Sequence, residues 1–476
     1  MPRSPTADRA RSGRVRGGAL LAALLGLGCA SLAPASGPGG TEAAPPATDT
    51  TRTGGTEVGV VPGAPAGAAT GETEPRLPRR QPYLRVGLAV GLDSIEVSAE
   101  AGLRARDLGT GTMLTAEAGR WKIRSVPGGL EALPVAAAGA GSGRGDGGPG
   151  RAGATARPRQ DVLFESRRDS GTVRVDGRTY RGGFEVLALP DRGLVLINRV
   201  RLEDYLLGVV PLEIGPRGPD EEAAVRAQAV AARTYALANL GRRDSVGFDV
   251  FGSVEDQVYG GLEAERPEAT RAVRGTRGQV LTWRERPIRA YYHADGGGRT
   301  ARVDEVWNLP DAPYLQSVAD TASNGEDWGA SDPHHVWEVR WTAAELAHAL
   351  DSGLSSYYGS PVSHTDRVTA LRVLGWTPSG RVAALEIRTE GGRFVVEHND
   401  IRFVLLRPDG KVLPSTLFRV EAAPDAGSGG LTLRGRGNGH GVGMCQWGAI
   451  GRARAGQTYG HILAAYYPGA ELRTAY

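Results

Sequence analysis

Short runs of alternating apolar and polar residues dominate the chain from residue 83 onward. This alternation predicts β-strands, and it recurs at residues 83–90, 173–181, 183–189, 194–198, 279–283, 289–293, 368–374 and 382–388. Asp176-Gly177 divides the second run and is a strong signal for a two-residue hairpin turn. The close spacing of the runs indicates strands joined mainly by hairpins.

Helical patterns are confined to a few segments. An alanine-rich helix is expected over residues 221–240, because Pro219 and the acidic residues after it are typical of a helix start. Two shorter helices are expected over residues 343–350 and 459–466, the second capped by Thr458. Helices scattered among hairpin strands predict an α+β fold rather than a repeated βαβ unit.

The first 35 residues have the pattern of a signal peptide. Five arginines precede a run of leucine and alanine at residues 19–27, which is too short to span a membrane. Gly28-Cys29-Ala30 looks like a lipoprotein cleavage site, so Cys29 is the expected site of lipidation. Ordinary cleavage after Ala33-Pro34-Ala35 is the alternative. Both routes export the protein to the cell envelope.

Composition divides the rest of the chain into three parts. Residues 36–80 are rich in Gly, Ala, Thr and Pro and lack apolar periodicity, so a disordered, flexible tether is expected. Residues 81–190 are expected to form a β-rich region, interrupted by a low-complexity insertion at residues 136–159. Residues 191–476 contain the candidate catalytic chemistry.

The charge balance gives no indication of a nucleic-acid partner. Residues 1–35 hold five of the 56 basic residues and one of the 53 acidic ones, which leaves the mature chain with a net charge of about −1. Such a chain lacks the basic footprint of a nucleic-acid-binding protein. Cys29 and Cys445 are the only cysteines, so lipidation of Cys29 would leave Cys445 without a disulfide partner.

Glu213 is the leading candidate for an acid catalyst. Val210, Leu212 and Ile214 surround it in the sequence and suggest that its carboxyl group lies against apolar surface. Such surroundings favour the protonated form that a general acid needs near neutral pH. The alternative is an exposed glutamate in a turn, where it would cap the helix expected from residue 221.

A glycine loop at residues 435–449 is the densest signal after Glu213. Glycine occupies every second position from 435 to 443, which lets the backbone approach a ligand closely and present His440 and Gln446. His293 similarly precedes a turn of three glycines. Neither G-x-G-x-x-G nor G-K-[ST] is present, so a phosphate-binding loop is not indicated. A tightly packed corner with a buried histidine is the structural alternative.

Two other chemistries compete with ligand binding as interpretations of these residues. His293, His334, His335 and His440 could converge on a metal ion. Neither a cysteine pair nor an H-E-x-x-H motif accompanies them, so we expect no metal and no other cofactor. Cys445 could be a thiol nucleophile, but no third group that would orient it is evident. A small buried residue is the preferred interpretation of Cys445.

Five motifs stand in order between residues 202 and 472. They are LEDYLLGVVPLE at residues 202–213, AQAVAARTY at 227–235, DQVYGG at 256–261, HGVGMCQWGA at 440–449 and YYPGAEL at 466–472. Together they closely resemble the stage II sporulation protein D and LytB amidase-enhancer family. The resemblance begins near residue 190, and the strands from residue 84 look like the upstream portion of the family.

This resemblance implies a protein directed at peptidoglycan. Sporulation members of the family are lytic transglycosylases, which cut peptide-free glycan strands and leave a 1,6-anhydro end on N-acetylmuramic acid. The LytB members enhance a peptidoglycan amidase. By the same resemblance Glu213 is the catalytic acid. The substrate-binding positions implied in the same way are Gln228, Arg233, Tyr235, His293, His440 and Gln446.

Three departures from the family pattern stand out. Cys445 replaces the usual serine, which is a nearly isosteric change. Asn438 stands where an aromatic residue is common, so a platform for stacking a sugar is missing there. Some sporulation members hold zinc with cysteine and histidine near the loop that corresponds to His293. This chain has no cysteine in that loop, which argues against a zinc site.

We therefore expect an exported lytic transglycosylase that cleaves the bond from N-acetylmuramic acid to N-acetylglucosamine, with Glu213 as its single acid and base. One carboxylate suffices because the C6 hydroxyl of the sugar replaces water as the nucleophile. Arg233 or backbone N–H groups of the glycine loop could stabilise developing charge. The alternatives are a non-catalytic amidase activator or glycan-binding module, and a structural envelope protein.

Overall fold

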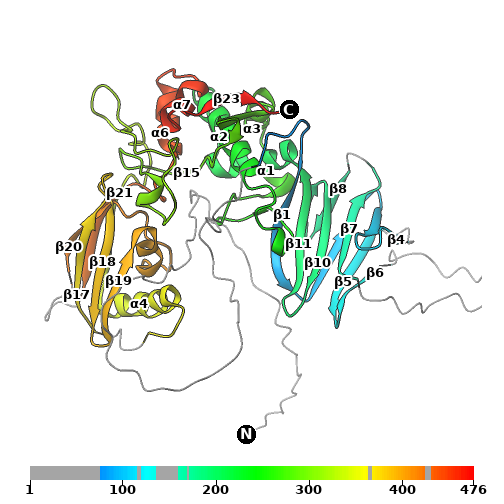
Figure 1. The fold of residues 1–476 in the computed structure, drawn as a ribbon, viewed down its shortest axis with the longest axis horizontal. Coiled ribbons are helices and arrows are strands. Elements are labelled where there is room, and N and C mark those ends of the chain that lie inside the picture. Colours follow the sequence, from blue (N-terminus) through cyan, green and yellow to red (C-terminus); the bar gives the residue numbers. More distant parts are fainter. Residues whose placement is uncertain (1–74, 115–118, 136–158, 169–170, 363–366, 424–429) are drawn as a thin grey trace, which may run out of the picture.

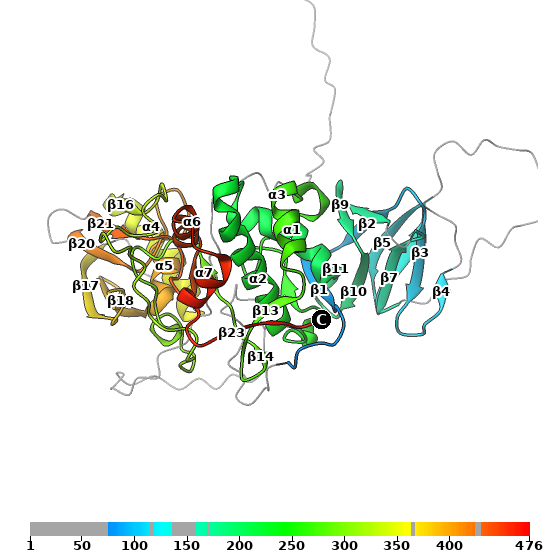
Figure 2. The ribbon, with the colours of Figure 1, turned by 90° about the horizontal axis from the view of Figure 1, so that it is seen from above.

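The computed structural model describes residues 75–114, 119–135, 159–168, 171–362, 367–423 and 430–476. The signal peptide, Cys29, most of the tether and most of the low-complexity insertion lie outside these residues. Helices and mainly antiparallel strands are mixed, which confirms the expected α+β fold. Figures 1 and 2 show three parts in a row, with a β-rich part at each end and a helical part between them.

Two antiparallel sheets form the N-terminal part. Their strands are β1 (Tyr83–Leu92), β2 (Ser94–Ser98), β3 (Leu103–Asp107), β4 (Met113–Leu114), β5 (Arg120–Val126), β6 (Gly129–Pro134), β7 (Asp161–Ser166), β8 (Thr172–Val175), β9 (Arg178–Arg181), β10 (Gly183–Leu189) and β11 (Gly193–Arg201), with β12 (Val250–Phe251) added in parallel to β1. One sheet has the order β12-β1-β11-β10-β7-β3-β4 and the other β6-β5-β2-β8-β9. Trp121 of one sheet meets Phe164 of the other edge to face, so the apolar faces pack together.

The hairpin predicted at Asp176-Gly177 is confirmed. Strands β8 and β9 are joined at this dipeptide, where Asp176 has φ 47° and Gly177 has φ 80°. Two successive positive φ angles are the requirement of the turn that matches the right-handed twist of paired strands. The Asp-Gly pair therefore sets the register of this hairpin.

Five helices make up the central part. They are α1 (Leu202–Ile214), α2 (Glu222–Ala238), α3 (Pro267–Gly275), α6 (Gln446–Arg454) and α7 (Tyr459–Tyr466), with short 3-10 turns at η1 (Pro219–Glu221), η2 (Asp244–Val246), η3 (Gly261–Ala264) and η4 (Val303–Glu305). The predicted alanine-rich helix is α2, and most of its alanines are buried among the neighbouring helices. Thr458 caps α7 as predicted, since its hydroxyl accepts the N–H of His461.

Helix α1 was not predicted, and the reason is physical. It contains Gly208 and Pro211, two residues that normally weaken a helix, and nearly all of its side chains are buried. Burial on every side removes the polar stripe by which an amphipathic helix is recognised. Tertiary packing therefore stabilises a helix that the sequence pattern conceals, and Glu213 lies in its last turn.

A second β-rich unit is inserted between two short strands of the central part. It comprises β16 (Val336–Trp341), α4 (Ala343–Tyr358), β17 (Val368–Trp376), β18 (Val382–Thr389), β19 (Gly392–Glu397), η5 (His398–Asp400), α5 (Ile401–Val404), β20 (Phe418–Ala422) and β21 (Leu431–Arg436). We call it the inserted unit. It has a hydrophobic core of its own. Helix α4 is longer than predicted, because a capping box at Thr342 starts it and only Gly359, with φ 65°, ends it.

Strands β15 (Tyr292–His293) and β22 (Met444–Cys445) flank the inserted unit in sequence and pair in parallel. The strand predicted over residues 289–293 is reduced to β15. A small antiparallel sheet of β14 (Arg286–Pro287), β13 (Gln279–Trp283) and β23 (Glu471–Thr474) completes the central part. Within the described ranges no helix combines the length and the apolar character that crossing a membrane requires.

Candidate active site

Glu213 is buried, with only 7% of its surface exposed. The flanking Val210 and Ile214 are buried as well, while Leu212 points outward. One carboxylate oxygen, Oε1, accepts the backbone N–H of Val258 at 2.8 Å. Glu213 is thus neither in a surface turn nor the cap of α2, and a backbone group fixes the direction of its carboxylate.

Gln228 and Gln446 meet across the contact of α2 with the start of α6. The side-chain Nε2 of Gln446 donates to Oε1 of Gln228 at 3.3 Å, and both residues are buried. The Nε2 group of Gln228 has no hydrogen-bond partner among the described residues. An amide N–H that is buried in this way is costly unless another group satisfies it. The pair therefore leaves one buried donor group at the contact of α2 with α6.

His293 and His440 lie side by side, with ring centroids 5.4 Å apart. The Nε2–H group of His440 donates to the carbonyl oxygen of Tyr292 at 2.9 Å, and its Nδ1 accepts the N–H of Val442 at 3.0 Å. These two bonds fix a neutral tautomer. His293 donates from Nδ1 to the carbonyl oxygen of Val442 at 3.1 Å, so its Nε2 is left as an acceptor.

Both histidines are held neutral. Burial lowers the pKa of His293 to about 3, and burial together with the neighbouring His293 lowers the pKa of His440 well below its usual value. The Nε2 atom of His293 is buried and has no hydrogen-bond partner among the described residues. These rings are therefore suited to accept or support hydrogen bonds, and not to exchange protons near neutral pH.

The glycine loop needs glycine for steric reasons. Gly441 has φ 86°, and a Cβ atom there would lie 2.3 Å from the guanidinium of Arg381. Gly443 has φ 70°, and a Cβ atom there would lie 2.0 Å from the carbonyl oxygen of Tyr291. Any side chain at these positions would clash and strain the backbone. These glycines thus let the loop pack closely against Arg381 and against the residue that precedes β15.

Cys445 acts as the N-cap of α6. Its sulfur accepts the N–H of Gly448 at 3.1 Å and that of Gly296 at 3.3 Å, and the residue is fully buried. Burial and the nearby carboxylates of Asp320 and Asp295 raise the pKa of the thiol well above its ordinary value. A nucleophilic cysteine needs the thiolate, so the environment favours the packing interpretation.

Arg233 and Tyr235 lie on α2 but point into structural networks. Arg233 is fully buried and forms an ion pair with Glu203 at the start of α1. Glu203 and Glu213 are ten residues apart on α1, which corresponds to about 15 Å along the helix. Tyr235 donates its hydroxyl to Asp256 at 2.6 Å. Their assignment to substrate binding stays a prediction, and the contacts observed are internal.

The segment after Glu213 touches the helix that begins with Gln446. The guanidinium of Arg217 lies over the ring of Trp447, 4.9 Å from its centroid, and Arg454 of α6 pairs with Glu221. Gln446 directly follows β22, which pairs with the strand that carries His293. The segment that follows α1 therefore contacts α6, and Gln446 at the start of α6 bonds Gln228 of α2 and follows the strand paired with β15.

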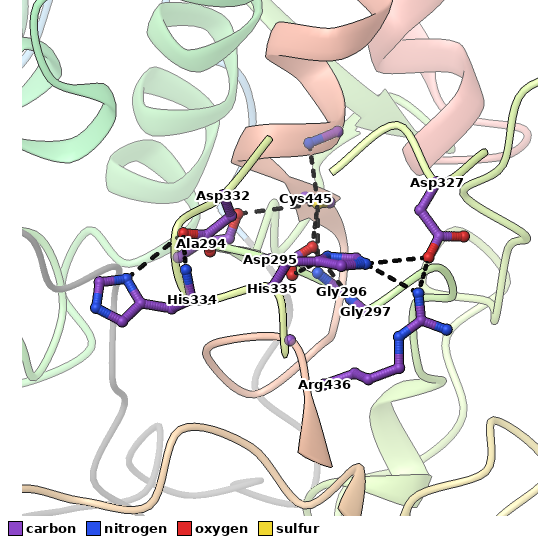
Figure 3. A network of polar contacts seen from close by, with 12 residues as sticks. Ala294, Asp295, Gly296, Gly297, Asp327, Asp332, His334, His335, Arg436 and Cys445 are labelled. Atoms are coloured by element: carbon purple, nitrogen blue, oxygen red, sulfur yellow. Dashed lines mark hydrogen bonds and ion pairs between the residues drawn. The ribbon is translucent and has the colours of Figure 1, made fainter. Parts of the chain in front are cut away.

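His334 and His335 lie in the network drawn in Figure 3, which also contains Asp295 and Cys445. His335 bonds Asp295 through Nδ1 at 2.7 Å and Asp327 through Nε2 at 3.1 Å, and Arg436 also bonds Asp327. His334 is largely exposed beside Asp332. The four histidines thus do not converge. No three His, Cys, Asp or Glu side chains are arranged to hold a metal ion in the part of the chain that the structure describes.

Two family models match the chain. Residues 191–283, which hold α1, α2 and Glu213, match the stage II sporulation protein family. Residues 328–443, which hold the inserted unit, match a domain of unknown function. Taken with the similarity to named relatives, these matches show that the chain belongs to the stage II sporulation protein D and amidase-enhancer family.

Relatives from two genera share this similarity. An uncharacterized protein of Brachyspira hyodysenteriae is 30% identical over 315 residues, which cover 66% of this chain and 77% of that protein. The stage II sporulation protein D of Bacillus subtilis is 29% identical over 294 residues, or 59% of this chain and 76% of the relative. The amidase enhancer of Bacillus subtilis is 29% identical over 304 residues, or 56% of this chain and 40% of the relative.

Proposed function

We propose that this protein acts on peptidoglycan in the cell envelope as a lytic transglycosylase, with Glu213 as its single acid and base. The observation that carries the proposal is the buried carboxylate of Glu213, oriented by the N–H of Val258. A proton donor in an apolar setting is what cleavage of a glycosidic bond requires. The relatives named for sporulation and for amidase enhancement agree with a peptidoglycan substrate.

The reaction needs one carboxyl group used twice. Glu213 first gives its proton to the glycosidic oxygen, so that the bond from C1 of N-acetylmuramic acid to the leaving N-acetylglucosamine breaks. The C6 hydroxyl oxygen of the same sugar then attacks C1, and the Glu213 carboxylate takes the proton of that hydroxyl. A 1,6-anhydro bond forms and water is not consumed. Glu213 ends in the protonated state in which it began.

Neutral polar groups on α2 and β15 suit an uncharged sugar. The Nε2–H of Gln228 is a donor and the Nε2 of His293 an acceptor, and neither has a partner among the described residues. Sugar hydroxyl and acetamido groups both give and accept hydrogen bonds, so these two side chains complement them. On this basis we assign direct substrate contacts to Gln228 and His293. Gln446, which bonds Gln228, and His440, whose ring lies beside that of His293 and whose nitrogens bond Tyr292 and Val442, support these two side chains.

The test uses the mature protein and peptide-free glycan strands. The wild type should release products with 1,6-anhydro ends, identified by mass spectrometry. Glu213→Gln keeps the size of the side chain but cannot cycle a proton, so the rate should fall by about 10²–10⁴. Glu390→Gln, at an exposed glutamate of the inserted unit, is the matched control and should cleave normally. Normal cleavage by Glu213→Gln would remove the catalytic assignment.

Activation of an amidase is the second candidate function. It is favoured by the similarity to the amidase enhancer, of which this chain covers 40%. In that case a peptidoglycan amidase would be the partner, and Glu213→Gln would leave the stimulation of the amidase intact. Measuring amidase activity with the wild type and with this variant separates the two functions.

A further inference from the structure

The loop at residues 256–260 crosses the last turns of α1 and carries the N–H that holds Glu213. This segment begins the DQVYGG motif, for which the proposed function supplies no role. Three of its residues make buried side-chain bonds, and the other two, Val258 and Gly260, bond α1 through their backbone N–H groups. We call residues 256–260 the positioning loop.

Gln257 ties the positioning loop to three separate elements. Its Oε1 accepts the hydroxyl of Tyr205 in α1 at 3.2 Å. Its Nε2 donates to the hydroxyl of Tyr292 in β15 at 2.9 Å and to the carbonyl oxygen of Ala232 in α2 at 3.3 Å. The side chain is fully buried. One amide thus connects the helix that carries Glu213, the helix that carries Gln228 and the strand that carries His293.

Asp256 anchors the start of the positioning loop. Its carboxylate accepts the hydroxyl of Tyr235 at 2.6 Å and the N–H of Phe251 at 2.8 Å, and it forms an ion pair with Arg243 at 2.8 Å. Burial and the Asp256 charge raise the pKa of Tyr235 well above its ordinary value, so the phenol remains a donor at all physiological pH values. The start of the loop is therefore held from three directions.

The other end of the loop lies directly on α1. The hydroxyl of Tyr259 donates to Asn198 at 2.9 Å, and its ring lies 4.9 Å from that of Tyr205. The N–H of Gly260 donates to the carbonyl oxygen of Gly208 at 3.1 Å. A Cβ atom on Gly208 would lie 2.7 Å from the Tyr259 ring. The glycine in α1 is thus required for the close approach of the loop.

We infer that the positioning loop sets the place and direction of the Glu213 carboxylate, with Gln257, Asp256 and Tyr235 as positioning residues that act through the Val258 N–H. The position of Val258 is fixed from both sides, because the anchored residues stand immediately before and after it. A displaced acid protonates the glycosidic oxygen less effectively, since even about 1 Å of misplacement can cost 10²-fold in rate. The catalytic consequence rests on the proposed function, whereas the structural link does not.

This inference gives Tyr235 a role that differs from the expected substrate contact. A positioning residue acts on the chemical step, so its loss should lower kcat and leave KM nearly unchanged. A substrate contact made equally in the ground state and transition state would instead raise KM. Tyr235→Phe removes only the hydroxyl group that donates a hydrogen bond to Asp256. This variant therefore distinguishes a positioning residue from a substrate contact.

The experiment combines kinetics with nuclear magnetic resonance of the Val258 amide. In the wild-type protein the Val258 amide resonance should shift with pH as Glu213 ionises, and this titration should be absent in Glu213→Gln. In Tyr235→Phe and Gln257→Leu the pH-dependent shift of the Val258 amide resonance should be smaller. In both variants kcat should fall by about 10-fold to 100-fold. Tyr358→Phe removes a hydroxyl that bonds Val395 in the inserted unit, and as control it should change neither readout.

The outcomes of this experiment distinguish the positioning role from a substrate contact and from a failure of the proposed function. An unchanged titration and kcat in folded Tyr235→Phe and Gln257→Leu would overturn the positioning role, as would a higher KM with unchanged kcat. The positioning role would also be overturned if the Val258 amide resonance of the wild type did not shift as Glu213 ionises. If glycan cleavage is absent while the titration behaves as described, the proposed function fails and the positioning role stands. If Gln257→Leu does not fold, Tyr235→Phe decides.

Discussion

Arg233 and Glu203 form a bidentate ion pair inside the helical part, with both N–O distances at 2.8 Å. Glu203 also accepts the hydroxyl of Tyr476 at 2.7 Å and the N–H of Gly278 at 3.1 Å. Burial alone would raise the pKa of Glu203, but these bonds, led by that from Arg233, lower it. The pair joins α1, α2 and the last residue of the chain.

Removing one member of this pair should destabilise the fold without altering the chemistry. Arg233→Met leaves a buried carboxylate without its partner, which typically costs about 3–5 kcal/mol. We expect that loss in urea denaturation, with glycan cleavage by the folded fraction retained at low temperature. The double variant Arg233→Met/Glu203→Leu should recover most of the stability. A stable Arg233→Met with a raised KM would instead support substrate binding.

Cys445→Ser should keep both fold and activity. Serine is a better N-cap than most residues, and its hydroxyl can accept the Gly448 N–H that the sulfur now accepts. Cys445→Ala lacks an acceptor, so its free energy of unfolding should fall by about 1 kcal/mol. Thermal denaturation and glycan cleavage measure the two effects. A folded but inactive Cys445→Ser protein would revive the thiol-nucleophile interpretation.

The stability contribution of His293 should depend on pH with a defined sign. Its folded-state pKa of about 3 lies below the unfolded value of about 6.5, so the unfolded chain takes up the proton first as the pH falls. The contribution is complete above about pH 6.5 and declines towards pH 3. The difference in melting temperature between the wild type and His293→Gln should therefore narrow from pH 8 to pH 4.

His348, which is exposed on α4, supplies the control for this measurement. The melting temperature of His348→Gln should differ from that of the wild type by the same small amount at both pH values. If the difference in melting temperature between the wild type and His293→Gln widens as the pH falls, His293 is charged in the folded protein. That result would contradict its buried, neutral setting.

The N-terminus of the mature protein should be an acylated Cys29. This expectation rests on the lipoprotein-like cleavage site in the sequence, which lies outside the described residues. The tether of about 45 residues would have a root-mean-square length of roughly 35–40 Å, enough to reach nearby glycan. Cys29→Ser should release the protein from membranes or leave it unprocessed. Mass spectrometry that finds an unmodified Ser36 at the N-terminus would show ordinary cleavage instead.

The sequence pattern predicted those elements whose signals are local. The Asp176-Gly177 hairpin and the Thr458 cap depend on neighbouring residues, and both are confirmed. Helix α1 was missed because its stability comes from burial on all sides. The hydrogen bond from Val258 to Glu213 joins residues 45 positions apart through a backbone group. A backbone N–H is common to almost every residue type, so this contact has no sequence signal.

The inserted unit has a consequence for the order in which the chain assembles. His293 and Val442, which bond across β15 and the glycine loop, are 149 residues apart. Within this interval the bond from Trp337 to Gly437 closes a span of 100 residues. If the inserted unit folds first, roughly a third of the interval remains to be closed, which lowers the loop-closure cost by about 1 kcal/mol. Prior folding of the inserted unit would thus lower the entropic cost of pairing β15 with β22, and the contact of His293 with His440 would then form after the inserted unit.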